Sequence, residues 1–316
     1  MTEPAVSPND AATSPATAAG LSLRAVEAPS PLLQLMESRV VFELGAFLAS
    51  SPLLRMVGRG DNHPVLILPG FIGGDDSTWA LRAVLRAQGY WVHGWGLGQN
   101  LGPTDATLEG IHARLQELHD RHGARVSLVG WSLGGIYARE MARENPDAVR
   151  QVITLGSPFR MRDQDRSAAS PISDRLEQFW QEEALRRSEA EHEKPPLQVP
   201  STAIYSRTDG VVRWHICIDT EAPQRENIEV IASHVGLGVS PAVIFAISDR
   251  LAQPEGDWRR FTPPIYLRHL YPRPASFSEA EREAKAVGAK SSRSSARRSP
   301  RKRPAPTSRA RRTAKS

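Results

Sequence analysis

The stretch VSLVGWSLGGIYAREM, residues 126–141, decides the fold. Its first four residues form a short apolar run that is typical of a buried parallel strand, and its last six continue at helical spacing. Between them, Gly130-Trp131-Ser132-Leu133-Gly134 matches the G-x-S-x-G pattern. A strand that turns sharply into a helix needs small residues where the two backbones meet, and the glycines supply that room. We therefore expect Ser132 to project at the carboxyl end of the strands, where α/β sheets place their sites.

Strand-like and helix-like segments alternate on both sides of this turn. Strands are expected at residues 65–68, 90–95, 125–130, 151–155, 202–206 and 228–232, and helices at residues 77–88, 104–122, 133–144 and 241–251. Strands separated by helices imply βαβ crossovers. The sequence therefore predicts an α/β fold, with a mostly parallel sheet covered by helices on both faces.

The α/β body is expected to span residues 58–271. Residues 1–31, rich in Ala, Pro, Ser and Thr and without an aromatic residue, predict a disordered lead. Residues 32–57 carry apolar side chains at helical spacing up to a break at Pro52, which indicates one or two helices packed on the body. Residues 272–316 are expected to form a disordered basic tail after a short helix near residues 278–286.

An insertion at residues 157–200 separates two of the expected strands. Insertions of this length are more often functional lids than plain connections. The apolar residues of its helix fall on one face, which we expect to roof Ser132 and shape an apolar acyl pocket: Ile172, Leu176, Phe179, Trp180 and Leu185. An ordinary helix packed permanently on the sheet is the alternative.

The charge of the chain is uneven. Of its 316 residues 40% are hydrophobic, enough for a sizeable core, and the formal net charge is +5. Lys290 to Ser316 hold eleven Lys and Arg and no acidic residue, which leaves 29 basic against 35 acidic residues in the rest of the chain. The single cysteine, Cys217, excludes an internal disulfide framework and a multi-cysteine metal site.

The basic stretch from Lys290 to Ser316 lacks aromatic residues and therefore lacks a platform for base stacking. We expect a non-specific, salt-dependent contact with a polyanion such as nucleic acid, an anionic membrane surface or an acidic partner. A solvated tail without a partner is the alternative. Because the first twenty residues have neither a basic n-region nor an apolar core, we do not expect them to act as a secretory signal. The apolar stretch at residues 40–57 is too short and broken for a transmembrane segment. A cytoplasmic location is the resulting expectation.

A serine hydroxyl needs an adjacent base, and the base needs an orienting acid. His234 follows the last expected strand directly, in a loop that contains glycines. Asp209 follows the fifth strand in the same way. Both loops open at the end of the sheet where Ser132 is expected, so we predict Ser132 as nucleophile, His234 as base and Asp209 as acid.

Other residues are weaker candidates for these roles. His215 falls inside the alternating run at residues 211–218, where a packing role is expected, and Asp219 is the alternative acid. Three histidines fall on one expected helix, where we expect them at solvated surface positions: His112, His119 and His122. No HExxH motif is present. The sequence therefore predicts neither a metal site nor a cofactor.

Two backbone N–H groups are expected to bind the oxyanion of the tetrahedral intermediate. One is the amide of Leu133, directly after the nucleophile at a helix N-terminus. The other comes from the loop after the first strand, Leu68-Pro69-Gly70-Phe71-Ile72-Gly73-Gly74, where Phe71 is the first choice and Ile72 the alternative.

The combination of LPGFIGG, GWSLGG, SRTDGVV and SHVGLG, in this order, resembles an α/β-hydrolase of the lipase/esterase kind from Pro64 to about Leu251. The resemblance implies a helical lid on the parallel sheet and a serine carboxylic-ester hydrolase with an acyl-enzyme intermediate, acting on a small-molecule or lipid ester. Two other functions stay open. One is an acyltransferase or thioesterase with the same triad, and the other is a polyanion-binding protein that acts through its basic tail.

This sequence departs from many esterases at two places. The oxyanion loop reads Pro-Gly-Phe where many esterases have His-Gly-Gly-Gly, and Trp131 replaces a common histidine before the nucleophile. Both departures leave the acyl and alcohol preferences open. The residues expected to contact substrate are Trp131, Ile72, Phe179 and Trp180.

Overall fold

The computed structural model describes residues 26–58, 60–161, 165–176, 191 and 194–283. Most of the expected lead, the lid residues Phe179, Trp180 and Leu185, and residues 284–316 of the basic tail lie outside these ranges. Their expected roles therefore stay predictions.

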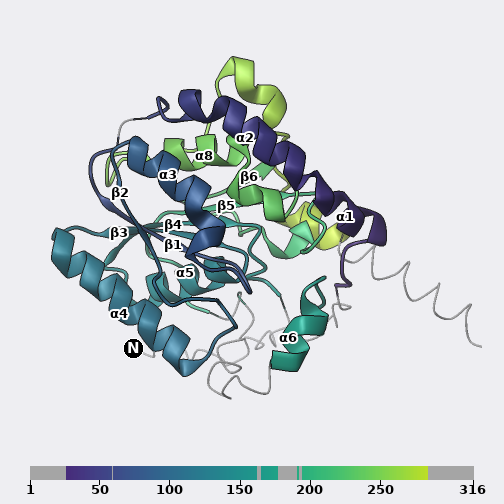
Figure 1. Ribbon diagram of the computed structural model, residues 1–316, viewed down its shortest axis with the longest axis horizontal. Coiled ribbons are helices and arrows are strands. Elements are labelled where there is room, and N and C mark those ends of the chain that lie inside the picture. The colour runs from purple at the N-terminus through teal and green to yellow at the C-terminus, as the bar shows by residue number, and fades with distance from the viewer. Residues whose placement is uncertain (1–25, 59, 162–164, 177–190, 192–193, 284–316) are drawn as a thin grey trace, which may run out of the picture.

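The described residues form one six-stranded sheet in the order β2-β1-β3-β4-β5-β6, and every neighbouring pair is parallel (Figure 1). The strands are β1 (Pro64–Leu68), β2 (Trp91–Gly94), β3 (Val126–Trp131), β4 (Val149–Leu155), β5 (Ser201–Ser206) and β6 (Arg225–Val230). Leu68 at the end of β1 is in register with Gly130 in β3. The loops that follow these two strands therefore leave the sheet at the same level.

Helices cover both faces of the sheet, as the alternating pattern predicts. One face carries α3 (Trp79–Ala87), which follows the short helix η2 (Asp75–Thr78), together with α8 (Pro241–Leu251). The other face carries α4 (Asp105–His122) and α5 (Leu133–Glu144). Side chains along β1 alternate between two apolar cores: Val65 and Ile67 lie in the core of α3 and α8, and Leu66 and Leu68 in that of α4 and α5.

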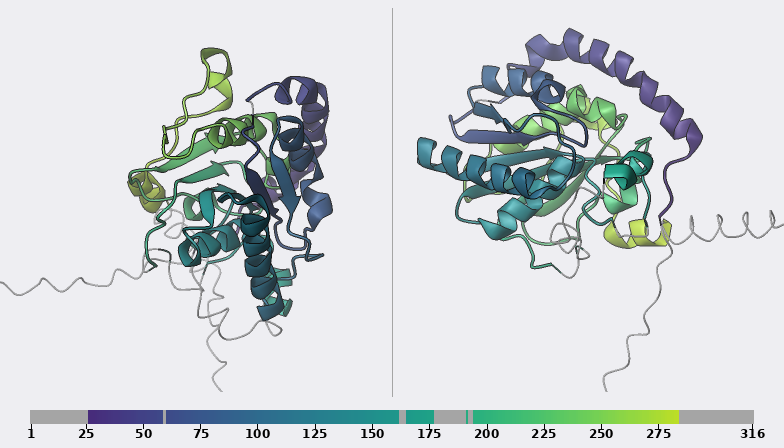
Figure 2. Two further views of the ribbon diagram at one scale, coloured as in Figure 1. Left: turned by 90° about the vertical axis from the view of Figure 1, so that its left-hand side faces the viewer. Right: turned by 60° about the horizontal axis from the view of Figure 1, so that its bottom comes forward.

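A continuous helical run, here named the N-terminal segment (residues 31–54), lies along the outside of the α3–α8 layer (Figure 2). It comprises α1 (Pro31–Leu35), η1 (Met36–Arg39) and α2 (Val40–Leu54). Pro52 lies inside α2, so the expected break at this residue is wrong. Phe47 and Leu54 are buried in the core that contains α8, and this packing holds the last turn despite the missing proline N–H.

The N-terminal segment is packed less deeply than its apolar spacing suggests. Phe47 and Leu54 are buried, but most of its large apolar side chains face outward, with Phe42 81% and Leu35 72% exposed. The other strongly exposed side chains of this kind are Leu32, Val41, Leu48 and Leu53. This outward apolar face is the reverse of an ordinary surface helix.

The ends of the described chain are ordered beyond the expected boundaries of the body. Val26, placed by the sequence in the disordered lead, is buried and donates its N–H to Asp165 Oδ1 at 2.6 Å. Residues 277–283 are helical, with Ala280 buried in a small core shared with Tyr205. The remaining short helices are α6 (Ser170–Leu176), η4 (Trp214–Ile216), η5 (Val235–Gly238) and η6 (Ile265–Leu270).

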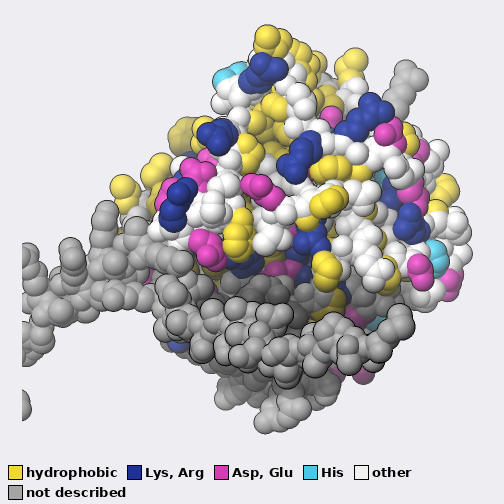
Figure 3. Space-filling model, turned by 180° about the vertical axis from the view of Figure 1, so that it is seen from behind, with side chains coloured by type: hydrophobic (Ala, Val, Ile, Leu, Met, Phe, Trp, Pro, Cys, Tyr) yellow, Lys and Arg dark blue, Asp and Glu magenta, His cyan; other side chains and the backbone are white. Residues whose placement is uncertain are grey.

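The surface of the described body carries charges of both signs. Seen from behind, Lys and Arg side chains are mixed with Asp and Glu side chains, and hydrophobic side chains gather at the top (Figure 3). Within the described ranges, no helix combines the length and the apolar character that crossing a membrane requires.

Candidate active site

Ser132 occupies a strained backbone position in the turn from β3 to α5. Its φ is 53° and its ψ is −121°, a conformation that costs a residue other than glycine about 1–3 kcal/mol. The neighbouring glycines permit the turn: a Cβ on Gly130 would overlap the backbone of Gly134, and one on Gly134 would overlap the carbonyl of Leu68. The turn therefore holds the Ser132 side chain at the carboxyl end of β3, next to the first turn of α5.

Asp209 and His234 meet at this same end of the sheet, because they follow β5 and β6. Asp209 Oδ2 lies 2.6 Å from His234 Nδ1. The other carboxylate oxygen, Oδ1, accepts the N–H groups of Val211 and Val212 at 2.8 and 2.7 Å. Both side chains are buried, so the acid is fixed by its own loop and in turn fixes the imidazole.

The electrostatics of this pair favour the protonated imidazole. Burial lowers the pKa of His234, but the charge of Asp209, its hydrogen bond and the charge of Glu37 outweigh burial and raise the pKa above its ordinary 6.5. An imidazole that gains affinity for a proton from a fixed carboxylate is suited to accept one from a hydroxyl.

Ser132 Oγ makes no hydrogen bond to another described residue. Its neighbours are nevertheless close: a Cβ added to Gly70 would lie 3.2 Å from Ser132 Cβ. Gly156, with φ +51°, passes beside the acid–base pair, and a Cβ there would lie 3.1 Å from Asp209 Oδ2 and 3.2 Å from His234 Nδ1. Any side chain at Gly156 would therefore crowd the pair.

The loop after β1 brings its backbone up to the nucleophile. The N–H of Ile72 donates to the carbonyl of Asn100 at 2.7 Å, so this amide, the alternative oxyanion donor, is already engaged. The role of Phe71 as an oxyanion donor stays a prediction. Leu133 is the first residue of α5, where helix N–H groups lack partners within the helix.

Asn100 is a residue that sequence reasoning missed. It is fully buried, and it donates from Nδ2 to the carbonyl of Pro69 at 2.9 Å. Its backbone N–H donates to the carbonyl of Gly73 at 2.8 Å, and its own carbonyl holds Ile72. Asn100 therefore fixes the loop after β1 at three backbone groups. No sequence pattern around Asn100 indicates this role.

Of the expected substrate contacts, the structure describes Trp131 and Ile72. Trp131 donates from Nε1 to the carbonyl of His234 at 3.2 Å, and its ring packs over Gly238. It therefore supports the loop of the base as well as bordering the site. The side chain of Ile72 is 51% exposed on the oxyanion loop. Phe179 and Trp180 lie outside the described residues.

The rival residues are engaged elsewhere. His215 stacks on Trp214, with ring centroids 4.0 Å apart, in η4 rather than in an alternating strand. Asp219 accepts from Arg139 at 2.8 Å and from Ser201 Oγ at 3.2 Å, in a buried ion pair. Within the described ranges, no group of three or more His, Cys, Asp or Glu is placed to hold a metal ion.

Comparison with known proteins gives the same fold. The model of the alpha/beta hydrolase family matches residues 65–298. Aspergillus fumigatus lipase B is 17% identical, with a TM-score of 0.48, over 62% of this chain and 54% of that one. A monoacylglycerol lipase from Paleococcus ferrophilus is 13% identical, with a TM-score of 0.44, over 62% and 96% of the two chains.

A carboxylesterase from Bacillus subtilis is 12% identical, with a TM-score of 0.41, over 64% of this chain and 95% of that one. No curated protein matches the sequence. The chain spans about half the length of the Aspergillus lipase. The family match covers most of the parallel sheet and the turn at Ser132, and the expected fold class is confirmed. The chain belongs to the alpha/beta hydrolase family.

Proposed function

We propose that the protein is a serine hydrolase that cleaves carboxylic esters through an acyl-enzyme intermediate. The observation that carries this proposal is the 2.6 Å contact between Asp209 and His234 at the end of the sheet where the strained turn presents Ser132. A strained nucleophile turn beside a fixed acid–base pair is the arrangement of α/β-hydrolases that use serine.

In the proposed first half-reaction, His234 Nε2 takes the proton of Ser132 Oγ as the oxygen attacks the acyl carbonyl. Asp209 keeps His234 Nδ1 protonated and stabilises the imidazolium that forms. The amides of Leu133 and Phe71 bind the developing oxyanion, and loss of one such donor typically costs about 3–4 kcal/mol. His234 then gives its proton to the departing alcohol.

In the second half-reaction, His234 takes a proton from water as the water oxygen attacks the acyl carbon. The bond to Ser132 Oγ then breaks, His234 returns the proton to this oxygen, and the carboxylic acid leaves. The raised pKa of His234 means that the neutral, base-competent imidazole dominates only above pH 6.5. We therefore expect kcat/KM to fall as the pH drops through a midpoint above 6.5.

A fluorophosphonate probe tests the nucleophile. We expect the probe to label the wild-type chain once, at Ser132, and to leave Ser132→Ala unlabelled. A series of p-nitrophenyl esters with increasing acyl length then measures hydrolysis and the size of the acyl pocket. Labelling that persists in Ser132→Ala, or hydrolysis that survives it, would overturn the proposal.

The acyl acceptor is measured in the same assay. With water as acceptor, the free acid is the product whether or not an alcohol is added. An acyltransferase would divert most of the acyl group to the added alcohol, and a thioesterase would prefer the corresponding thioester over the oxygen ester.

A further inference from the structure

The charged residues of the N-terminal segment all face inward. This segment (residues 31–54) contains three of them, Glu37, Arg39 and Glu43. All three bond to the loops that carry Asp209 and His234, while most of the large apolar side chains of the segment are exposed. Ordinary surface helices show the reverse distribution, so this one is built to bring charged groups to the two loops.

Glu37 joins the loop of the acid to the loop of the base. Its Oε1 accepts the N–H of Gly210, next to Asp209, at 2.7 Å and the N–H of His234 at 2.9 Å. Its Oε2 accepts the N–H of Val235 at 3.0 Å. One carboxylate thus holds three backbone donors from two loops that follow different strands. Hydrogen bonds to a charged acceptor are about twice as strong as those between neutral groups.

Arg39 and Glu43 extend this connection in both directions. The Arg39 guanidinium donates to the carbonyl and the hydroxyl of Thr208, both at 2.8 Å. Glu43 Oε1 accepts the N–H of Ser233 at 2.7 Å, and Oε2 accepts the Ser233 hydroxyl. The residues before and after both Asp209 and His234 are therefore fixed from the same helical run.

Two glycines leave room for this approach. A Cβ on Gly210 would overlap the carbonyl of Leu33, and a Cβ on Gly236 would overlap the Glu43 carboxylate. The close contact of the N-terminal segment with both loops therefore depends on positions that carry no side chain.

We propose that Glu37 is a positioning residue of the active site, which sets the relative placement of Asp209 and His234 by bonding both of their loops at once. This inference rests on the proposed function of these two residues. Glu37 touches neither substrate nor the reacting oxygen. It acts through the backbone of the base and of the residue after the acid.

The charges around His234 give this role a second readout. Asp209 contacts the ring of His234, and Glu37 contacts its backbone N–H. Glu43 contacts the preceding residue, and Arg39 Nε lies 3.4 Å from Glu43 Oε1. From β3, the element that faces this loop, the neutral ring of Trp131 approaches the imidazole of His234. Because Glu37 helps to raise the pKa of His234, removal of its charge lowers that pKa.

Three variants separate charge, hydrogen bonding and folding. Glu37→Gln keeps the shape and one acceptor oxygen but loses the charge and presents an amide N–H₂ to the Val235 N–H. Glu37→Ala removes every contact. Ser38→Ala is the matched control, because Ser38 is exposed on the same turn and its hydroxyl bonds only to the nearby carbonyl of Leu35 among the described residues.

We expect Glu37→Ala to lower kcat by up to about 100-fold, the effect of displacing a catalytic group by about 1 Å, with little change in KM. We expect Glu37→Gln to recover part of this loss and to move the acid limb of kcat/KM to lower pH. Ser38→Ala should match the wild type in kcat and in the position of the acid limb of kcat/KM. NMR titration of the His234 ring in the Ser132→Ala background measures the same pKa shift without any turnover.

A purely structural role predicts a different result, in which Glu37→Gln lowers the melting temperature but leaves kcat and the pKa of His234 unchanged. That result overturns the inference. An unchanged pKa of His234 in the Ser132→Ala background overturns it even if no substrate is found. A wild-type chain that neither reacts with the fluorophosphonate nor cleaves esters contradicts the proposed function instead, and the two failures are thereby distinguished.

Discussion

Two serine–histidine–aspartate arrangements lie at opposite ends of the same sheet. At the carboxyl end, Asp209 holds His234 beside the turn of Ser132. At the amino end, before β1, Asp61 Oδ1 bonds His63 Nδ1, and His63 Nε2 lies 2.8 Å from Ser127 Oγ in β3. The second arrangement has both of its hydrogen bonds formed, and yet its serine cannot act as a nucleophile.

The backbone around each serine explains this difference. Ser127 is fully buried in the regular part of β3, between its neighbours in β1 and β4, so no acyl group can reach its hydroxyl. Ser132 stands in a strained turn at the start of a helix, where we expect backbone N–H groups to bind an oxyanion. A hydrogen-bonded triad is therefore insufficient without an accessible serine and donors for the oxyanion.

The two histidines also differ in the charged residue that acts on them in addition to the aspartate: Arg150 at His63 and Glu37 at His234. Burial is the largest cause that lowers the pKa of His63 below 6.5, the hydrogen bond and charge of Asp61 raise it, and the charge of Arg150, which pairs with Asp61 at 2.8 Å, adds to the lowering. At His234, Glu37 adds a negative charge and the pKa is raised. A neighbouring aspartate alone does not decide the protonation of a buried histidine, since burial and the other nearby charges also shift its pKa.

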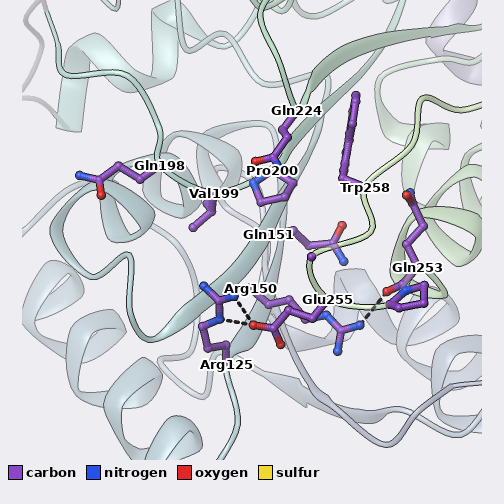
Figure 4. A pocket seen from close by; sticks show the side chains of 12 residues that line it. Arg125, Arg150, Gln151, Gln198, Val199, Pro200, Gln224, Gln253, Glu255 and Trp258 are labelled. Atoms are coloured by element: carbon purple, nitrogen blue, oxygen red, sulfur yellow. Dashed lines mark hydrogen bonds and ion pairs between the residues drawn. The ribbon is translucent and has the colours of Figure 1, made fainter.

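The amino end also carries a hollow of about 140 Å³, lined by residues directly before β3, β5 and β6, by Arg150 and Gln151 near the start of β4, and by the loop after α8 (Figure 4). Arg125 pairs with Glu255, and Arg150 donates to the carbonyl of Gln253 at 2.7 Å. Ser127 does not line this hollow. Its presence therefore does not give the second arrangement access to a substrate.

Substitution of the two histidines should give the largest difference in kcat between the two arrangements. His234→Ala should lower kcat for ester hydrolysis by about 10⁴- to 10⁶-fold, because the base is lost, and the double variant with Ser132→Ala should be hardly worse. His63→Ala should keep near-normal kcat at reduced stability. Normal turnover in His234→Ala, or a comparable loss in His63→Ala, would show that the wrong arrangement has been chosen.

Substitution of the two acids should separate the arrangements further. Asp209→Asn keeps the shape of the side chain but favours the wrong tautomer of His234, so we expect a loss in kcat of about 10³- to 10⁴-fold. Asp61→Asn should leave kcat unchanged, because its histidine takes no part in the reaction. Steady-state kinetics on one p-nitrophenyl ester gives kcat for both variants. Equal losses in kcat would contradict the prediction that only the arrangement at Asp209 takes part in the reaction.

The stability of the protein should depend on pH in opposite senses at the two histidines. The folded pKa of His63 lies below its unfolded value of 6.5, so stability is lost as the pH falls below 6.5. His93 and His215, whose pKa burial lowers to about 4, act in the same direction between pH 6.5 and 4. The contribution of His234 is present below pH 6.5 and is lost as the pH rises through its raised pKa.

Urea unfolding between pH 4 and pH 9 measures this dependence. We expect the free energy of unfolding to fall on acidification below pH 6.5, less steeply in His63→Asn than in the wild type. His234→Asn should instead flatten the profile above pH 6.5. An unchanged acid slope in His63→Asn would show that His63 does not resist protonation in the folded protein.

The smallest expected effect concerns Arg150. Arg150→Gln removes the positive charge beside Asp61, so the pKa of His63 should rise, and ester hydrolysis should not change. NMR titration of the His63 ring gives the shift, with the His234 ring as internal control because Arg150 lies at the other end of the sheet. A fall in the pKa of His63 would contradict the assigned role of Arg150.

Sequence reasoning placed the elements well where the signal is local. The turn at Ser132 and the loops of Asp209 and His234 follow short apolar runs directly, and parallel strands bring such loops to one edge of the sheet. The structure places Asp209 and His234 in contact. The catalytic roles of the three residues and of Phe71 and Leu133 stay predictions.

Residues whose role depends on distant partners escaped the same reasoning. Asn100 is a polar residue in an irregular loop, and its importance lies in the three backbone groups that it holds. Glu37 and Glu43 stand in an apolar helical run, where the spacing indicates a buried face and gives no reason to expect charged groups inside. Hydrogen bonds between residues far apart in the chain do not produce a recurring pattern in the sequence.

The long reach of Glu37 has a consequence for the order in which the chain is made. Its partners Gly210 and His234 lie 173 and 197 residues further along. Since synthesis proceeds from the N-terminus, the helix that carries Glu37 leaves the ribosome long before either loop exists. Its two carboxylates then lack their partners in these loops, and the contacts with both loops form only once β6 and the loop after it have been added. A nascent chain that ends before this loop therefore lacks the hydrogen bonds by which Glu37 joins the loops of Asp209 and His234.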